Sequence, residues 1–111
     1  MVNTYKVAGQ AAPIADTDTE LYKVPANMEF LASTLVICNR SLNGDASIFR
    51  IAIVPDGQVL GNKHYIAYDQ FIDPRKSKDR VIGITLSAND SVYVRSNTAN
   101  LSFTLFGTEL S

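Results

Sequence analysis

The sequence has little of the chemistry that metal centres and nucleophilic enzymes need. Its 111 residues include one cysteine, Cys38, one histidine, His64, and no tryptophan. A single cysteine cannot form an intramolecular disulfide, and these two side chains cannot supply the ligand set of a zinc site. No G-x-S-x-G turn is present to expose a serine that His64 could activate. We therefore expect no catalytic residue, no metal ion and no cofactor, with Cys38 buried as inert packing and His64 bonded to the backbone at a strand end.

The sequence also lacks an excess of charge and a long apolar run. Ten Lys and Arg stand against eleven Asp and Glu, which gives a formal net charge of −1. Because nucleic-acid-binding proteins are normally basic, we expect no nucleic-acid partner. No run approaches the roughly 18 apolar residues of a membrane span, and the first residues lack the hydrophobic stretch of a secretory signal peptide. We therefore expect neither membrane insertion nor export by a signal peptide.

What the sequence does contain is apolar residues at every second position. No window of about eleven residues or more has the i, i+3, i+4, i+7 spacing of an amphipathic helix, whereas period-two alternation recurs throughout the chain. Since successive side chains of a strand point to opposite faces, this alternation predicts half-buried β-strands. The residues expected on the buried faces are Leu35, Ile37, Phe49, Ile51, Ile53, Val92, Val94, Leu101, Phe103 and Leu105.

Turn-forming sequences separate these segments and predict an all-β fold. About seven or eight short antiparallel strands with one apolar face each must pack as two sheets, because a single sheet would leave that face in water. We predict an antiparallel β-sandwich, jelly-roll-like, in a single domain over residues 19–111, preceded by an arm or edge segment over 1–18. The predicted strands are residues 5–9, 19–24, 29–39, 48–54, 64–71, 80–86, 91–96 and 101–109.

A charged segment follows the predicted strand 64–71. It contains Asp73, Arg75, Lys76, Lys78 and Arg80, and Pro74 at its start favours a turn. No aromatic residues alternate with these charges, as they would in a surface that stacks nucleic-acid bases. We therefore predict a solvated loop, and we assign it as a candidate contact for a partner protein with an acidic rim.

Carboxylates offer two weaker hypotheses. Asp16, Asp18 and Glu20 fall on one side of an extended segment, where oxygens could surround a hard cation, but the helices and central glycine of an EF-hand are missing. A solvated acidic segment is therefore the favoured interpretation. Pairs of other aspartates could meet in space and hydrolyse a glycoside, yet each of them lies in or beside a turn, where Asp commonly forms local hydrogen bonds.

The order of motifs along the chain resembles that of small β-rich virion proteins and fibre-like modules of tailed bacteriophages, which are common among phages of cyanobacteria. The resemblance extends from about Val7 onward. Two features depart from it, the charged and Pro-containing segment 71–80 and Glu29 beside bulky residues. The motifs are Leu21, Tyr22, Val24 and Pro25; Cys38 to Arg40; Phe49 and Arg50; Lys63 to Asp69; Gly83 to Leu86; and Leu101 to Glu109.

The resemblance implies a non-enzymatic structural component of a tailed-phage virion. Such a protein decorates the capsid, tail or baseplate, or attaches a fibre, and it acts through protein–protein interfaces with capsid or tail proteins. It is made in the host cytoplasm and ends in the virion. Because a short sandwich has open sheet edges to cover, we also expect a homo-oligomer, with a trimer or ring as the expected form.

A second hypothesis comes from a different class of function. In a carbohydrate-binding adhesion module, Tyr65, Tyr68 or Tyr93 would stack on a pyranose while an Asp or Asn binds its hydroxyl groups. The alternation of the strand 64–71 places Tyr65 and Tyr68 on opposite faces. A small hydrolase is the third and least favoured class, because the sequence shows no activated group.

Overall fold

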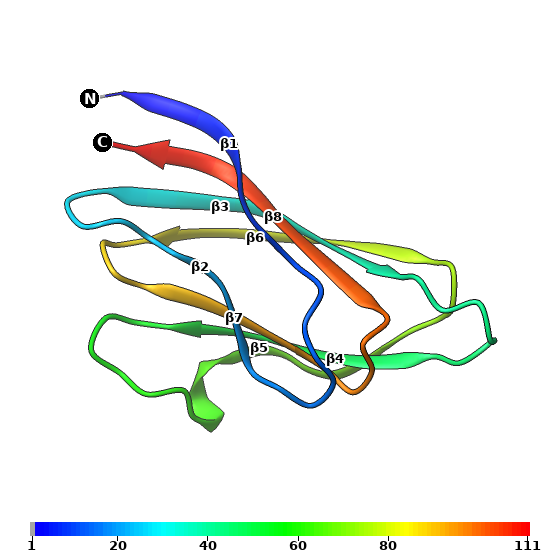
Figure 1. Cartoon of the computed structure of the whole chain (residues 1–111). Coiled ribbons are helices and arrows are strands. Elements are labelled where there is room, and N and C mark those ends of the chain that lie inside the picture. Colours follow the sequence, from blue (N-terminus) through cyan, green and yellow to red (C-terminus); the bar gives the residue numbers. More distant parts are fainter. Residues whose placement is uncertain (1) are drawn as a thin grey trace.

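The computed structural model describes residues 2–111, and nearly all of its regular structure is β-strand (Figure 1). A short 3-10 helix, η1 (Asn62–His64), precedes the fifth strand. Within the described residues, no helix is long and apolar enough to cross a membrane. The strands are β1 (Asn3–Ala11), β2 (Thr19–Lys23), β3 (Glu29–Asn39), β4 (Ser47–Val54), β5 (Tyr65–Ile72), β6 (Ser77–Leu86), β7 (Ser91–Ser96) and β8 (Leu101–Leu110).

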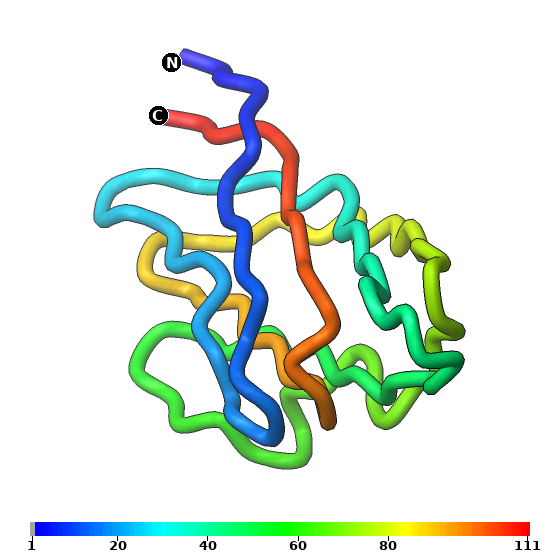
Figure 2. Tube along the Cα trace, turned by 45° about the vertical axis from the view of Figure 1, so that its right-hand side comes forward, coloured from blue at the N-terminus to red at the C-terminus, as the bar shows by residue number. Residues whose placement is uncertain are grey.

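The strands form two antiparallel four-stranded sheets, which we call sheet A and sheet B. Sheet A has the order β1-β8-β3-β6 and sheet B the order β2-β7-β4-β5. Successive strands pass from one sheet to the other except for β4 and β5, which are neighbours in sheet B, and this is the connectivity of a jelly roll. The two termini lie side by side at one end of sheet A (Figure 2), where Val2 and Ser111 exchange backbone hydrogen bonds. The predicted β-sandwich is confirmed.

The core lies between the inner faces of the two sheets and contains the residues that the alternation predicts. Leu35 of β3, Val92 of β7 and Leu105 of β8 are among its fully buried members. The rings of Phe49 and Phe103 meet edge to face across the sandwich, with centroids 6.4 Å apart. Ile53 is partly buried and packs against this cluster. Apolar burial on this scale, at about 25 cal/mol per Å², is the main favourable term in folding.

The N-terminal segment contributes a strand to the sandwich. Residues 1–18, expected as an arm or an edge segment, contain β1, which pairs with β8 from Asn3 to Ala11 and forms one edge of sheet A. A Cβ atom on Gly9 would lie 2.2 Å from the carbonyl oxygen of Leu21 in β2. The two sheets therefore approach closely along this side, and only glycine allows it.

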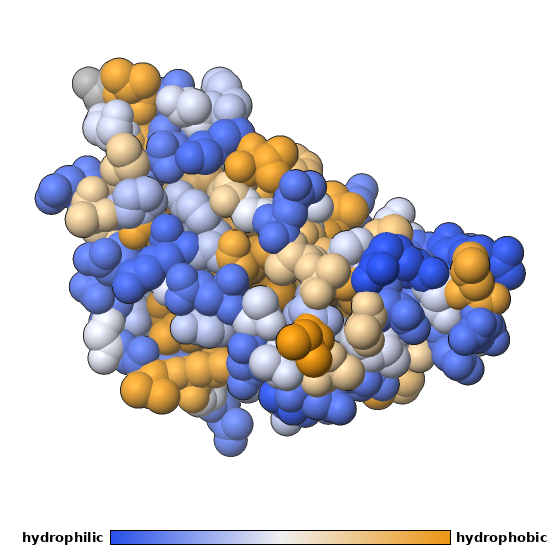
Figure 3. Space-filling view, in the orientation of Figure 1, coloured by the Kyte–Doolittle hydropathy of each residue, from blue (hydrophilic) through white to orange (hydrophobic). Residues whose placement is uncertain are grey.

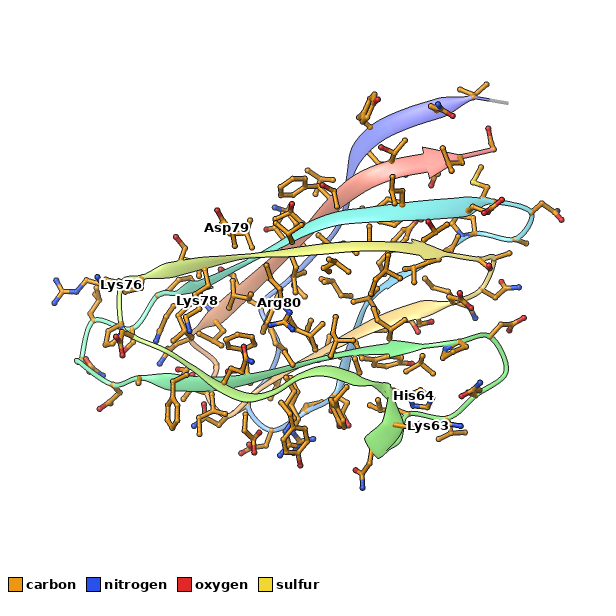
Figure 4. The ribbon with its side chains drawn as sticks, turned by 180° about the vertical axis from the view of Figure 1, so that it is seen from behind. Lys63, His64, Lys76, Lys78, Asp79 and Arg80 are labelled. Carbon is orange, nitrogen blue, oxygen red and sulfur yellow. The ribbon has the colours of Figure 1, made fainter. Side chains whose placement is uncertain are left out.

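The opposite side of the sandwich is closed by two basic side chains, Lys78 and Arg80. The strand β6 begins at Ser77, three residues before the predicted start, so both residues lie on a strand. They pair with inward-facing residues of β3, and Figure 4 shows Arg80 pointing from β6 toward β5. Arg80 donates to the Ile66 carbonyl at 2.6 Å, and Lys78 donates to the Phe71 carbonyl. Inward-pointing charges of this kind protect sheet edges from pairing with another chain.

Candidate functional site

The outer face of sheet B carries a cluster of charged and aromatic side chains, and we call it the arginine face. Arg50 of β4 lies directly across from Arg95 of β7. Tyr93 lies across from Ala52, which in turn lies across from Tyr65 of β5. Neighbours in an antiparallel ladder share a face of the sheet, so these side chains all point away from the core.

Arg50 is held by Asp69 in a two-point ion pair. Its Nε donates to Asp69 Oδ1 at 2.6 Å and its Nη2 to Oδ2 at 3.3 Å. This hydrogen bonding holds the pKa of Asp69 below its ordinary value and raises that of Arg50, so both groups stay charged. Burial acts in the opposite direction on both groups and is outweighed. Bidentate pairs of this kind fix orientation as well as charge.

Two register shifts in β5 create this geometry. Between the partners of Phe49 and Ile51, β5 has two residues, Tyr68 and Asp69, where β4 has only Arg50. Between the partners of Ile51 and Ala52, β5 has one extra residue, Ile66. Asp69 has a φ of +51°, in the left-handed region that non-glycine residues seldom adopt. Bulges re-aim side chains in this way next to functional sites, and strained backbone is found there as well.

The same register shifts bring Tyr65 and Tyr68 together. Their rings meet edge to face with centroids 5.0 Å apart, and the guanidinium carbon of Arg50 lies 4.1 Å from the centroid of Tyr68. The prediction that strict alternation would separate Tyr65 and Tyr68 on opposite faces is therefore wrong. Between them, Ile66 and Ala67 both pack against the core, which returns Tyr68 to the face of Tyr65.

The acidic segment predicted as solvated lies beside β7 on the same face. Asp18 pairs with Arg95 at 3.4 Å, and Tyr93 donates its hydroxyl to Glu20 at 3.2 Å. Burial first, and then the bond to Glu20, raise the pKa of Tyr93. Over residues 2–111 there is no cluster of His, Cys, Asp and Glu that could hold a metal ion.

A hollow of about 200 Å³ lies in this face, beside the Arg50–Asp69 pair. Its lining combines hydrogen-bond donors and acceptors, and Ile48 is its apolar member. Neither arginine was predicted as a site residue, although both occupy polar positions in otherwise apolar strands. The residues that line the hollow are Asp16, Ile48, Arg50, Asp69, Arg95, Ser96 and Asn97.

The outer face of sheet A carries five exposed large apolar side chains among threonines and other polar residues, and we call it the apolar face. It is defined by Tyr5 and Val7 of β1, Phe106 of β8, Leu31 of β3 and Val81 of β6. Tyr5 is 84% exposed and Val81 81% exposed. Cross-strand pairing joins Val7 to Phe106, and both Tyr5 and Leu31 to Thr108. Hydrophobic side chains are visible along the upper side of the molecule in Figure 3, where sheet A lies.

The polarity of β1 is reversed relative to an ordinary surface strand. Its large apolar residues Tyr5 and Val7 point outward, while Lys6 reaches Glu109 at 3.2 Å, and Glu109 also accepts from the hydroxyl of Tyr22 at 3.3 Å. Burial, followed by the charge of Glu109 and the bond to it, raises the pKa of Tyr22 to about 12. A hollow of about 580 Å³ lies over this part of the sheet, between Tyr5, Leu31 and Phe106.

The candidate contact segment is divided between a turn and a strand. Asp73, Arg75 and Lys76 are exposed in the short turn between β5 and β6, where backbone bonds to Asn39 hold Arg75 and Lys76. In contrast, Lys78 and Arg80 belong to β6 and bind β5, so the prediction of one continuous solvated loop is wrong. Figure 4 shows Lys76 at the turn, away from the body of the sandwich.

His64 and Cys38 have the reactive side chains of the protein, and neither lines the hollow of the arginine face. His64 is buried in η1, where its Nδ1 accepts from the Gly61 N–H at 2.9 Å and its Nε2 lies 2.8 Å from Gln58 Oε1. These contacts fit a neutral imidazole that donates through Nε2. Cys38 is half-buried, not fully buried as expected, because it lies on the outward side of β3.

A scan of the sequence against models of protein families finds no match, and a search of curated proteins finds no similar sequence.

Proposed function

We propose that this protein is a non-enzymatic structural component of a tailed-phage virion that works through protein–protein interfaces, beginning with contacts between its own copies. The apolar face is the observation that carries this proposal. Exposed apolar patches of this kind, rimmed by polar residues, mark interaction sites on soluble proteins. The phage assignment itself comes from the resemblance of the ordered sequence motifs.

Two features support association through this face rather than through a sheet edge. The edge strand β6 is protected by Lys78 and Arg80, whose side chains bond back to β5. On β1, the polar partner Lys6 turns inward to Glu109, which leaves Tyr5 and Val7 free to contact another molecule. Aromatic and aliphatic side chains in the centre of a contact contribute most of its free energy.

The proposed assembly is a homo-oligomer closed by symmetry, with a trimer as the expected form. A closed ring buries the same patch on every copy, so no exposed patch remains on which a filament could grow. In the particle, the exposed turn residues Asp73, Arg75 and Lys76 would remain available to capsid or tail proteins. This division assigns self-association to the apolar face and attachment to the turn.

The test of self-association compares Val7→Glu with Val59→Glu. Both valines are exposed, at 55% and 87%, but Val59 lies in the connection before η1 and outside the apolar face. In sedimentation equilibrium, the wild-type protein and Val59→Glu should form the same oligomer. Val7→Glu should raise the dissociation constant at least about tenfold, which is about 1.4 kcal/mol. A wild-type protein that stays monomeric at high concentration would contradict the proposal.

The test of the virion assignment uses purified particles of the phage that carries the gene. Quantitative mass spectrometry should find the chain in a fixed copy number per particle, and the copy number should be a multiple of the oligomer measured in solution. Absence from the particles would remove the virion assignment while leaving self-association standing.

A further inference from the structure

We infer that the hollow in the arginine face binds a neutral pyranose, with the Arg50–Asp69 and Arg95–Asp18 pairs bonding to its hydroxyl groups and the ring of Tyr68 positioning Arg50. This inference goes beyond the proposed function, which rests on the opposite face. It treats Tyr65 and Tyr68 as one cluster on one face, because register shifts in β5 bring their rings together.

The donors of the site are two guanidinium groups that are only partly used by the protein. A guanidinium carries five N–H donors. Asp69 accepts from Nε and Nη2 of Arg50, and Asp18 lies nearest Nη1 of Arg95. Their side chains are 26% and 30% exposed, so the remaining N–H groups can donate to a ligand in the hollow.

The acceptors of the site decide the charge of the ligand. Carboxylates of Asp16 and Asp69 line the hollow, and those of Asp18 and Glu20 lie beside it on the same face. Four acidic groups therefore surround two arginines, which disfavours phosphate, sulfate or a uronic acid. A hydroxyl group donates and accepts at once, and neighbouring ring hydroxyls can bridge a carboxylate and a guanidinium.

Tyr68 does not line the hollow but lies against the guanidinium of Arg50, which does. Its ring also contacts Tyr65 edge to face, so the two tyrosines hold Arg50 in place before a ligand arrives. A guanidinium fixed in this way loses little side-chain entropy on binding. Sugars present an apolar C–H face, and Ile48 supplies an apolar contact for it in the hollow.

The size of the hollow limits the ligand to a small unit. Its volume of about 200 Å³ is below that of pockets for drug-sized ligands, which begin near roughly 300 Å³. One sugar ring would occupy it while the rest of an oligosaccharide extends along the face. The strained left-handed backbone of Asp69 and its two-point ion pair prepare this arrangement in advance.

The experiment is a titration of the full-length, isotope-labelled protein followed by amide NMR. Methyl glucoside, methyl galactoside and methyl mannoside are added up to about 50 mM, because one ring in an open hollow binds weakly. Sodium phosphate and glucuronate are the anionic probes. We expect at least one neutral pyranoside to shift the amides of Arg50, Asp69 and Arg95, and neither anion to do so.

Two variants and two controls locate the site. Tyr68→Ala and Arg95→Gln should each weaken pyranoside binding at least fivefold, Tyr68→Phe should retain most of it, and Tyr5→Ala on the apolar face should retain all of it. The inference is overturned if no neutral pyranoside shifts these amides, if an anion binds there instead, or if Tyr68→Ala binds like the wild type. Because Val7→Glu leaves this face unchanged, failure here and failure of self-association are measured separately.

Discussion

The two outer faces of the sandwich share one core and differ in almost every other respect. The apolar face is built from aliphatic and aromatic side chains on four strands, several of them more than half exposed. The arginine face is built from ion pairs and tyrosines, with its most unusual backbone at Asp69. The shared core fixes which side chains point outward, whereas the residue types at those outward positions determine the chemistry of each face.

The backbone also differs between the two faces. Sheet A has a single register shift in each of its three pairings. The pairing of β4 with β5 in sheet B has two shifts within six residues. A regular surface suits a broad contact with another protein, whereas a locally distorted one suits a small ligand.

The largest expected effect comes from breaking the core on which both faces depend. Phe103→Ala should lower the free energy of unfolding by roughly 3 to 5 kcal/mol, because the ring is fully buried and packs against Phe49. Phe71→Ala is the matched control, since Phe71 is 63% exposed and should cost no more than about 0.5 kcal/mol. Urea denaturation measures both, and equal effects would refute the assigned core.

A smaller effect should follow from a substitution that distorts sheet A alone. A Cβ atom on Gly107 would lie 2.1 Å from the Leu31 carbonyl oxygen, so Gly107→Ala should cost about 1 to 3 kcal/mol and disturb the apolar face. Gly61→Ala meets nothing nearer than 3.9 Å and serves as the control. Amide shifts should spread over β3 and β8 and leave β4 and β5 unchanged. Spread into β5 would show that the two faces are coupled.

The arginine face is tested by separating the charge of Asp69 from its backbone. Asp69→Asn removes the ion pair and keeps a residue that tolerates positive φ, whereas Asp69→Ala removes both. Asp69→Ala should therefore be the less stable variant in thermal unfolding. Because the pKa of Asp69 lies below its ordinary value of 3.8, the ion pair should still be intact at pH 3.8. It should be lost only as the pH falls through the lower pKa of the folded protein. The NMR shift of the Asp69 carboxyl carbon measures its pKa in the folded protein. A measured pKa of 3.8 or above would contradict the prediction.

The smallest effect on stability is expected in the turn between the faces. Arg75→Glu combined with Lys76→Glu should change the free energy of unfolding by less than about 0.5 kcal/mol, since both side chains are exposed. The proposed virion role further predicts that the same double variant enters particles less efficiently, as measured by its copy number in purified virions. Unchanged incorporation would mean that the turn does not contact the particle.

Much of the fold could be predicted because period-two alternation is a local signal. The bounds predicted for 29–39 and 91–96 coincide with β3 and β7, and Leu101, Phe103 and Leu105 of β8 are buried as expected. The start of β6 was missed because Ser77 to Asp79 look like a charged loop. Their strand pairing is with β3, far away in the sequence, and no local pattern encodes it.

The candidate site was harder to predict for a related reason. Tyr65, Tyr68 and Tyr93 were predicted as separate candidates, and the structure brings all three to one face together with Arg50 and Arg95. The decisive feature is the bulged β5, and its left-handed residue is an aspartate. A glycine there would have signalled the bulge, whereas Asp69 reads as an ordinary polar strand position.

The back-to-back arrangement of the two sheets has a consequence for any assembly of this chain. Copies joined through their apolar faces would turn every arginine face toward the solvent at a fixed separation. A ligand chain that repeats one sugar unit could then engage several copies at once, and such avidity can exceed the single-site affinity by about 10²- to 10⁴-fold. Weak recognition by one small hollow would then suffice to hold a large particle on a polysaccharide surface.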